Sequence, residues 1–102
     1  MNLFNEDCLE YLKTIKDKSV DLILTDPPYA ISMNSKNHMS NDDWDKMSKE
    51  EFHEFNIKWL NECYRILKDD GNLWMFCAPS KIPELFETIS QTQFINHFSM
   101  TL

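Results

Sequence analysis

The chain has 102 residues, 42% of them hydrophobic and 13% aromatic, which fits one small domain with a modest core and excludes a disordered chain. Its net charge is −7, with only ten lysines and arginines. This acidic balance argues against a chain that binds nucleic acid unaided, because phosphate contacts need a basic face.

The sequence also argues against several kinds of site and location. No apolar stretch has the length of a membrane span, and the first twelve residues lack the basic-then-apolar pattern of a secretory signal. The three cysteines are odd in number and far apart, at Cys8, Cys63 and Cys77. We therefore expect reduced thiols in a cytoplasmic protein, and no metal site. The one glycine, Gly71, rules out a glycine-rich cofactor loop within these residues.

The first half of the chain predicts a short strand, a helix and a buried strand. Leu3-Phe4 is the candidate short strand, and apolar residues near helical spacing predict a helix over 7–16. Val20 to Thr25 is an apolar run without polar alternation after Asp21, which is typical of a strand covered on both faces of a parallel sheet. Residues 30–47 are polar and without a period, so they predict a long loop, either functional or a plain surface excursion.

The second half predicts a long amphipathic helix followed by shorter elements. Ser48 opens a capping box, Ser-Lys-Glu-Glu, and apolar residues at helical spacing then predict a helix over 49–68. Gly71 is expected to end this helix in a left-handed conformation. The remaining expected elements are a buried strand at 72–77, a helix over 80–92 that Ser80 caps, and a strand from residue 94 onward.

Strands alternate with helices in this order, which predicts an α/β fold with a largely parallel sheet. Trp59 and Trp74 occupy apolar positions of their elements and are expected in the core. In sheets of this kind, ligand sites lie at the carboxyl ends of the strands. Asp26-Pro27-Pro28-Tyr29 directly follows the predicted strand at 20–25 and is therefore the candidate site.

This tetrapeptide has a structural and a chemical interpretation. Structurally, prolines end a strand because they donate no ladder hydrogen bond, and Asp before Pro favours a turn. Chemically, the prolines make a rigid loop whose carbonyls can be aimed at a ligand. A flat ring with an exocyclic amino group would donate to the Asp26 carboxylate and the Pro27 carbonyl, and would stack on Tyr29. Two such acceptors localise the lone pair of the nitrogen and make the amine a better nucleophile.

Several motifs, taken in order, closely resemble one family. Asp-Cys-Leu-Glu-Tyr-Leu at 7–12 precedes Thr-Asp-Pro-Pro-Tyr at 25–29, and the stretches DDWD at 42–45 and KWLNECYRILKDDGNLWMF at 58–76 follow. Together they resemble the amino-methylating DNA methyltransferases, over about residues 3–95. The Asp-Pro-Pro-Tyr form resembles the adenine-N6 members. Its place near the N-terminus, with no glycine-rich loop before it, resembles the permuted group that puts the cofactor half last.

The resemblance implies a partial Rossmann-like fold that uses S-adenosylmethionine as methyl donor and DNA as substrate. It implies that Asp26, Pro27 and Tyr29 hold the flipped adenine and that Pro28 shapes the loop. It further implies that Asp7 lies near the adenine of the cofactor and that Asp26 also borders the cofactor.

The chain departs from this family in what its 102 residues lack. They contain neither the F-x-G-x-G cofactor loop nor the target recognition region, so we expect residues 1–102 to form the target-base half of a catalytic domain. The predicted function is site-specific adenine-N6 methylation of DNA by a truncated or split chain, with a second chain carrying the cofactor half as partner. An incomplete sheet would expose its edges, so we expect low stability or association.

Three alternative functions stay open at this stage. The first is cytosine-N4 methylation, although that group more often carries Ser in place of Asp26. The second is methylation of protein glutamine or ribosomal RNA by a related enzyme, where Asn is the usual residue at that place. The third is a non-catalytic remnant or partner subunit, which the single glycine and the acidic charge favour.

Overall fold

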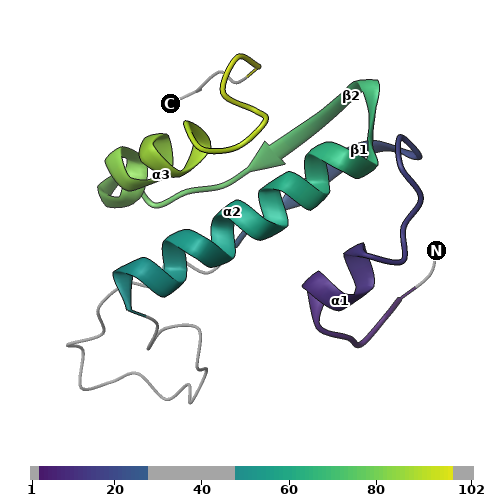
Figure 1. Ribbon diagram of the computed structural model, residues 1–102, viewed down its shortest axis with the longest axis horizontal. Helices are drawn as coiled ribbons and strands as arrows, with labels where there is room; N and C mark the ends of the chain where they lie inside the picture. The colour runs from purple at the N-terminus through teal and green to yellow at the C-terminus, as the bar shows by residue number, and fades with distance from the viewer. Residues whose placement is uncertain (1–2, 28–47, 98–102) are drawn as a thin grey trace.

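The computed structural model of the protein describes residues 3–27 and 48–97. Helices and strands alternate along the chain, and the two strands pair in parallel (Figure 1). The expected α/β arrangement is therefore confirmed for this small, two-stranded sheet. The elements, in order, are α1 (Cys8–Leu12), β1 (Val20–Thr25), α2 (Lys49–Ile66), β2 (Leu67–Met75), the 3-10 turn η2 (Pro79–Lys81) and α3 (Ile82–Ile89).

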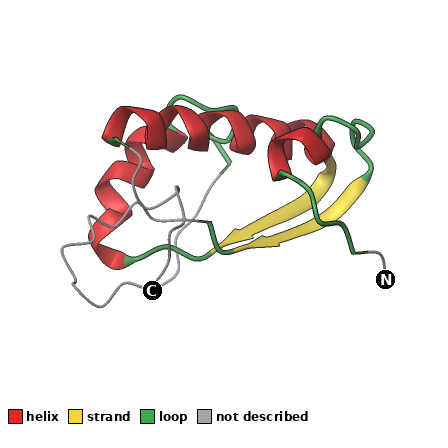
Figure 2. Ribbon diagram, turned by 90° about the horizontal axis from the view of Figure 1, so that it is seen from below, coloured by secondary structure: helices red, strands yellow, loops and turns green. Residues whose placement is uncertain are grey.

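The long helix α2 begins where its capping box predicts. Ser48 Oγ accepts a hydrogen bond from the backbone N–H of Glu51 at 3.1 Å. The apolar face of the helix lies over one face of the sheet (Figure 2), and Trp59 is buried there as expected. The buried core cluster consists of Phe55, Trp59, Leu60, Cys63 and Ile89, with half-buried Ile23, Leu73 and Met75 of the strands packed against it. The core therefore lies between α2 and the sheet, with α3 closing its end.

The expected left-handed turn at Gly71 is wrong, because β2 follows α2 directly. Val20 already pairs with Leu67, and Leu22 pairs with Asn72, so β2 advances from 67 to 72 while β1 advances from 20 to 22. The extra residues of β2 make a bulge that contains Gly71, which has no positive φ. A Cβ at this position would lie 3.1 Å from the backbone oxygens of Val20 and Lys68. Glycine is therefore required by close backbone approach and not by a turn.

Three other expected elements differ at their boundaries. The strand expected at 72–77 is β2, which begins at Leu67 and ends at Met75. The first helix is α1, much shorter than 7–16, because Asp7 caps it and the chain turns after Leu12. Ser80 caps no helix: it lies within η2, and α3 begins at Ile82 without a side-chain cap. Pro83 stands in the first turn of α3, where a missing N–H costs nothing.

Two expected strands are absent from the described residues. Leu3-Phe4 is exposed and forms no strand, because neither residue has a strand beside it within these ranges. Residues 94–97, where the last strand was expected to begin, form turns, and the His97 N–H donates to the Phe94 carbonyl at 2.8 Å. The rest of that expected strand, 98–102, lies outside the described residues. No described helix is long and apolar enough to cross a membrane.

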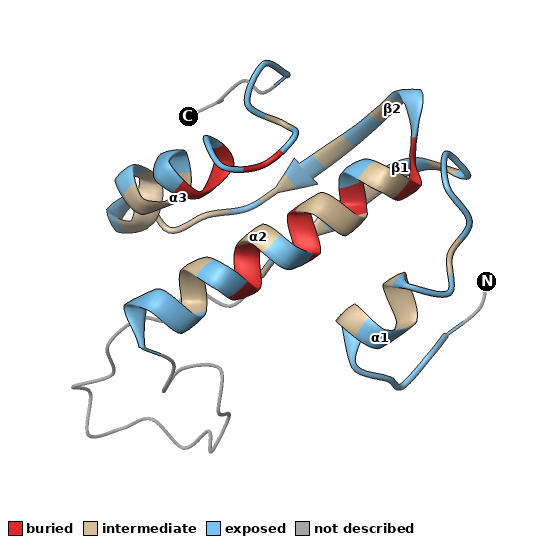
Figure 3. Ribbon diagram, viewed as in Figure 1, coloured by how far each residue is buried: buried red, intermediate tan, exposed pale blue. Residues whose placement is uncertain are grey.

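The prediction of a sheet covered on both faces is wrong for the described residues. Exposed and half-buried residues alternate from Leu22 to Thr25 in β1 and from Gly71 to Met75 in β2, as Figure 3 shows for β2. Trp74, expected in the core, lies on the exposed side. The apolar sequence of a parallel strand is the same whether or not the layers that cover it belong to the described residues. The sequence of a strand therefore does not tell which of these layers the described residues contain.

Candidate functional site

The candidate site begins at the carboxyl end of β1. Thr25 pairs with Met75, and the backbone N–H of Phe76 donates to the Thr25 carbonyl at 3.1 Å. Asp26 and Pro27 follow directly, with Asp26 exposed and Pro27 half-buried. Two parallel strands therefore fix the point from which this segment leaves the sheet. Pro28 and Tyr29, the other two residues of the predicted site, lie outside the described residues.

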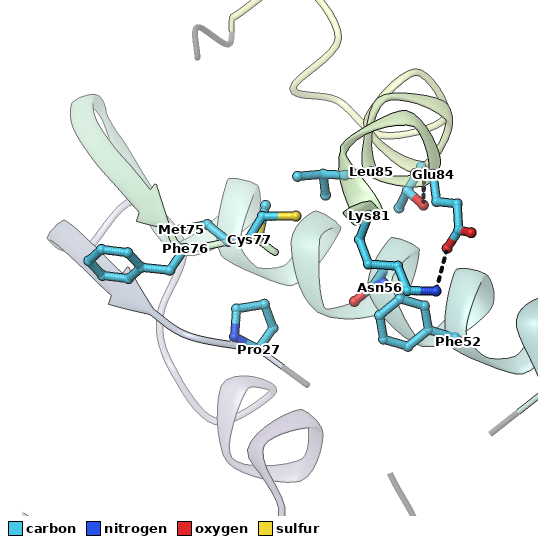
Figure 4. A pocket seen from close by; sticks show the side chains of 10 residues that line it. Pro27, Phe52, Asn56, Met75, Phe76, Cys77, Lys81, Glu84 and Leu85 are labelled. Atoms are coloured by element: carbon cyan, nitrogen blue, oxygen red, sulfur yellow. Dashed lines mark hydrogen bonds and ion pairs between the residues drawn. The ribbon is translucent and has the colours of Figure 1, made fainter. Parts of the chain in front are cut away.

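A small hollow of about 20 Å³ lies beside Pro27 (Figure 4). Four parts of the chain meet at this edge of the sheet and line the hollow. They are Pro27, α2, the end of β2 and α3. Among these residues are Phe52, Asn56, Cys77 and Leu85. A volume of this size holds about one water molecule, so the hollow does not by itself accommodate a nucleobase.

Three polar side chains around the hollow already have partners, either within it or in the core. Lys81 Nζ lies 3.4 Å from Glu84 Oε2, and Asn56 Oδ1 accepts a hydrogen bond from Trp59 Nε1 at 2.7 Å (the ion pair is drawn in Figure 4). Burial raises the pKa of the Cys77 thiol, which keeps it neutral and unsuited to act as a nucleophile. None of these side chains is assigned a chemical role here, and Asp26 and the backbone of Pro27 stay the acceptors predicted from the sequence.

Asn56 was not singled out by the sequence analysis, although a signal was present. It stands four residues after Phe52 and four before Leu60, and both of these belong to the apolar face of α2. A polar residue at such a position is buried and needs a partner, which Trp59 supplies. Helical spacing alone would have placed Asn56 on the apolar face of α2, whereas its position beside the hollow depends on tertiary packing.

Asp7, the expected cofactor residue, is a helix cap in this structure. Its Oδ1 accepts hydrogen bonds from the backbone N–H groups of Leu9 at 2.9 Å and Glu10 at 3.3 Å. The side chain is exposed, and α1 packs against α2, whereas Asp26 follows β1. The carboxylate therefore has a structural task at the start of α1, and its role toward a cofactor stays a prediction.

The described residues do not fit S-adenosylmethionine as a complete donor site. The hollow beside Pro27 is far smaller than the cavities that hold ligands of nucleoside size. A larger open groove of about 390 Å³ lies between α2 and α3, but Glu50, Glu54, Glu84 and Glu87 line much of it. It offers no glycine-rich turn, and its aromatic rings are those of Phe52 and His53. Within the described ranges, no three His, Cys, Asp or Glu side chains gather as metal ligands.

Comparison with known proteins identifies relatives of this chain. A family model described as DNA methylase, for N6 and N4 methyltransferases, matches residues 20–100. The type II methyltransferase M.HinfI of Haemophilus influenzae is 42% identical in an alignment of 78 residues that covers 68% of this chain and 22% of the relative. M.HpaI of Haemophilus parainfluenzae is 33% identical over 89 residues, which are 87% of this chain and 27% of the relative.

A third relative, the type II methyltransferase M.BamHI of Bacillus amyloliquefaciens, is 35% identical over 77 residues, 76% of this chain and 17% of the relative. The chain thus matches about a quarter or less of the length of each of these three enzymes. The family model begins at the first residue of β1 and includes the candidate site, α2, β2 and α3. The chain therefore belongs to the family of amino-methylating DNA methyltransferases, which confirms the resemblance drawn from its motifs.

Proposed function

We propose that this chain supplies the target-base half of a site-specific DNA methyltransferase that transfers a methyl group from S-adenosylmethionine to adenine N6. The observation that carries the proposal is the position of Asp26-Pro27 at the carboxyl end of a parallel strand, in a chain whose family acts on exocyclic amino groups. The Asp form of the motif favours adenine over cytosine, as the sequence resemblance implies.

In this proposal the target amino group is held by acceptors alone. The Asp26 carboxylate takes one N–H, the Pro27 carbonyl takes the other, Tyr29 stacks on the ring, and Pro28 stiffens the loop between them. When both N–H groups donate hydrogen bonds to these acceptors, the lone pair is localised on the nitrogen, which can then attack an electrophile. The pairing of β1 with β2 supports this role, because a rigid sheet edge keeps the two acceptors in fixed relation.

We propose that most of the residues that bind the methyl donor and the DNA lie outside residues 1–102. S-adenosylmethionine supplies the methyl group, with Asp7 and Asp26 as the residues of this chain near it. The net charge of −7 supports a division of labour in which another part of the enzyme, or a second chain, contacts the phosphates and carries the glycine-rich half. The three free cysteines support a cytoplasmic setting.

The test uses the purified chain together with a donor-side polypeptide. We would prepare the part of M.HinfI that remains when the segment matched by this chain is removed. The two polypeptides, duplex DNA and S-adenosylmethionine would be incubated together, and the nucleosides would be separated and weighed by mass spectrometry. We expect N6-methyladenine, and a loss of rate of about 100-fold or more in Asp26→Ala.

Asp21→Ala is the matched control, because Asp21 is an exposed aspartate of β1 that pairs with Lys68 at 2.9 Å, away from the carboxyl end. Its rate should equal that of the unmodified chain. Formation of N4-methylcytosine would establish the cytosine alternative. No methylated base, with both polypeptides folded, would contradict catalysis and favour a non-catalytic interaction module.

A further inference from the structure

Asn56 is a buried polar side chain on the apolar face of α2. It is 5% exposed, and it is among the side chains that surround the hollow beside Pro27 (Figure 4). The Nε1–H of Trp59 donates to its amide at 2.7 Å. An indole N–H only donates, so the amide atom that faces Trp59 is the oxygen, and the Nδ2 group lies at the other end of the amide. The buried indole therefore fixes the orientation of the Asn56 side chain.

The Nδ2 group of Asn56 has two hydrogens to donate. Among the described residues, no hydrogen bond from this group is found, and a buried amide N–H without a partner costs free energy. Every described side-chain nitrogen or oxygen that is fully buried has a partner. The Nδ2 group is therefore not fully buried, and the hollow that Asn56 lines is where it has access to a further partner.

The hollow has the size of one water molecule. Its volume is about 20 Å³, and a bound water needs roughly 10–15 Å³ and two or more polar partners. Lys81, Glu84 and Thr88, also at its walls, are engaged with one another. The Asn56 amide supplies one partner for a water. Pro27 can supply a second, because the polar group of a proline residue is its carbonyl oxygen.

We propose that one water molecule occupies this hollow, accepts a hydrogen bond from Asn56 Nδ2 and donates one to the Pro27 carbonyl. Asn56 is then a positioning residue for Pro27, a role that rests on the proposed function, in which this carbonyl accepts an N–H of the target amino group. A carbonyl oxygen has two lone pairs, so it can accept from the water and from the base together. The water links the acceptor to α2 and holds it in one direction.

The first test detects the water by nuclear magnetic resonance in the unmodified 102-residue chain, so it does not depend on how a variant folds. A long-lived bound water gives cross peaks of opposite sign in NOESY and ROESY spectra, whereas hydrogen exchange gives the same sign in both. We expect peaks of opposite sign between water and the Nδ2 hydrogens of Asn56. Asn61 of α2 is the internal control, because it does not line the hollow and should give none. The absence of such peaks at Asn56 overturns the proposal.

The second test asks whether the water holds Pro27. Asn56→Leu removes the donor and fills the hollow, and Asn61→Leu is the matched control, since it also removes an amide of α2, one that accepts from the Gln93 N–H at 3.3 Å. Circular dichroism first establishes that both variants fold. We expect ¹³C relaxation to give a lower order parameter at the Pro27 Cα in Asn56→Leu and an unchanged one in Asn61→Leu. Equal order parameters in the two variants overturn the positioning role.

The third test uses the enzyme reconstituted with the M.HinfI polypeptide that lacks the matched segment. A positioning residue acts on the chemical step, so Asn56→Leu should lower kcat about tenfold or more and leave the KM for DNA unchanged. Asn61→Leu should change neither constant, and equal kcat values in the two variants contradict the positioning role. If no mixture yields a methylated base, the proposed function fails, whereas the water and the order of Pro27 are still decided in the chain alone.

Discussion

Arg65 Nη1 in α2 lies 2.6 Å from Asp17 Oδ1, a residue 48 positions earlier in the chain. The same guanidinium donates to the backbone carbonyls of Leu12 and Ile15, each at 2.7 Å, and to Glu62 Oε2. Hydrogen bonds to Asp17 and Glu62 raise the pKa of Arg65, so the group stays charged. One side chain therefore closes the C-terminal end of α1 and fastens it to the last turn of α2.

Replacing Arg65 should cost more than removing its carboxylate partner. We expect Arg65→Met to lower the free energy of unfolding by about 2–3 kcal/mol, because two carbonyls lose a charged donor. Asp17→Asn should lower it by less than about 1 kcal/mol, since the Asp17 side chain is 72% exposed and the pair is screened by solvent. Urea denaturation followed by circular dichroism gives both values. If both variants lost the same free energy of unfolding, the hydrogen bonds from Arg65 to the two backbone carbonyls would contribute nothing to stability.

The bulge in β2 predicts that a side chain at Gly71 destabilises the protein. Gly71→Ala should lower the free energy of unfolding by about 1–2 kcal/mol, because the new Cβ would press on the backbone oxygens of Val20 and Lys68. Asn72→Ala, at the exposed next position, should change it by less than about 0.5 kcal/mol. Thermal unfolding of the two variants makes the comparison. An unchanged midpoint for Gly71→Ala would mean that the bulge widens freely.

The capping role of Asp7 can be separated from a cofactor role. Asp7→Ala should destabilise the protein by about 1 kcal/mol, because two N–H groups of α1 lose their acceptor. Asp7→Asn keeps a good capping oxygen and should match the unmodified chain in stability. The asparagine variant is therefore the one in which donor binding is to be measured in the reconstituted enzyme. If Asp7→Ala and Asp7→Asn have the same free energy of unfolding, helix capping is not the contribution of Asp7 to stability.

The buried thiol of Cys63 predicts a loss of stability in alkali. Burial, with smaller contributions from Cys8 and Glu62, raises the pKa of Cys63 from 9.0 to about 12. Between these values the unfolded chain releases a proton that the folded chain keeps, so stability falls as pH rises above 9. The slope for one such group is about 1.4 kcal/mol per pH unit.

Cys63→Ala isolates this effect from the other groups that titrate in alkali. The variant is less stable at neutral pH because it leaves a cavity in the core, but its stability should fall less steeply above pH 9. Urea denaturation at pH 8, 9 and 10 measures the difference. Parallel pH profiles for the two proteins would contradict the predicted titration.

The long elements were predictable from the sequence because their signals are local. The Ser48 capping box and the apolar spacing after it predicted α2 to within two residues at its end, and the apolar run Val20–Thr25 predicted β1. The bulge at Gly71 was not predictable, because it depends on the pairing of β2 with a strand far away in sequence. A glycine that follows a helix in the sequence is compatible both with a turn and with a close approach of two backbone segments. The local sequence does not distinguish the two.

The position of the candidate site was predictable from the sequence, but its surroundings were predictable only in part. Asp26 and Pro27 lie at the carboxyl edge of a parallel strand, as the alternation of strands and helices implied. The exposure of Trp74 was not predictable, because an apolar residue in a strand indicates burial without saying which layer covers it. The contribution of α3 to the hollow beside Pro27 depends on tertiary packing that no local pattern encodes.

The parallel pairing of β1 with β2 has a consequence during synthesis. Val20 pairs with Leu67, so β1 lacks its partner among the described strands until the ribosome has added 47 more residues, the difference between the two positions. At translation rates of about 5–20 residues per second, this apolar segment waits for roughly 2–9 seconds. Asp21 near its start and Asp26-Pro27 at its end interrupt the run with charge and with a residue that cannot extend a sheet. We therefore expect Asp26 and Pro27, which are proposed to hold a DNA base, to oppose aggregation of the nascent chain as well.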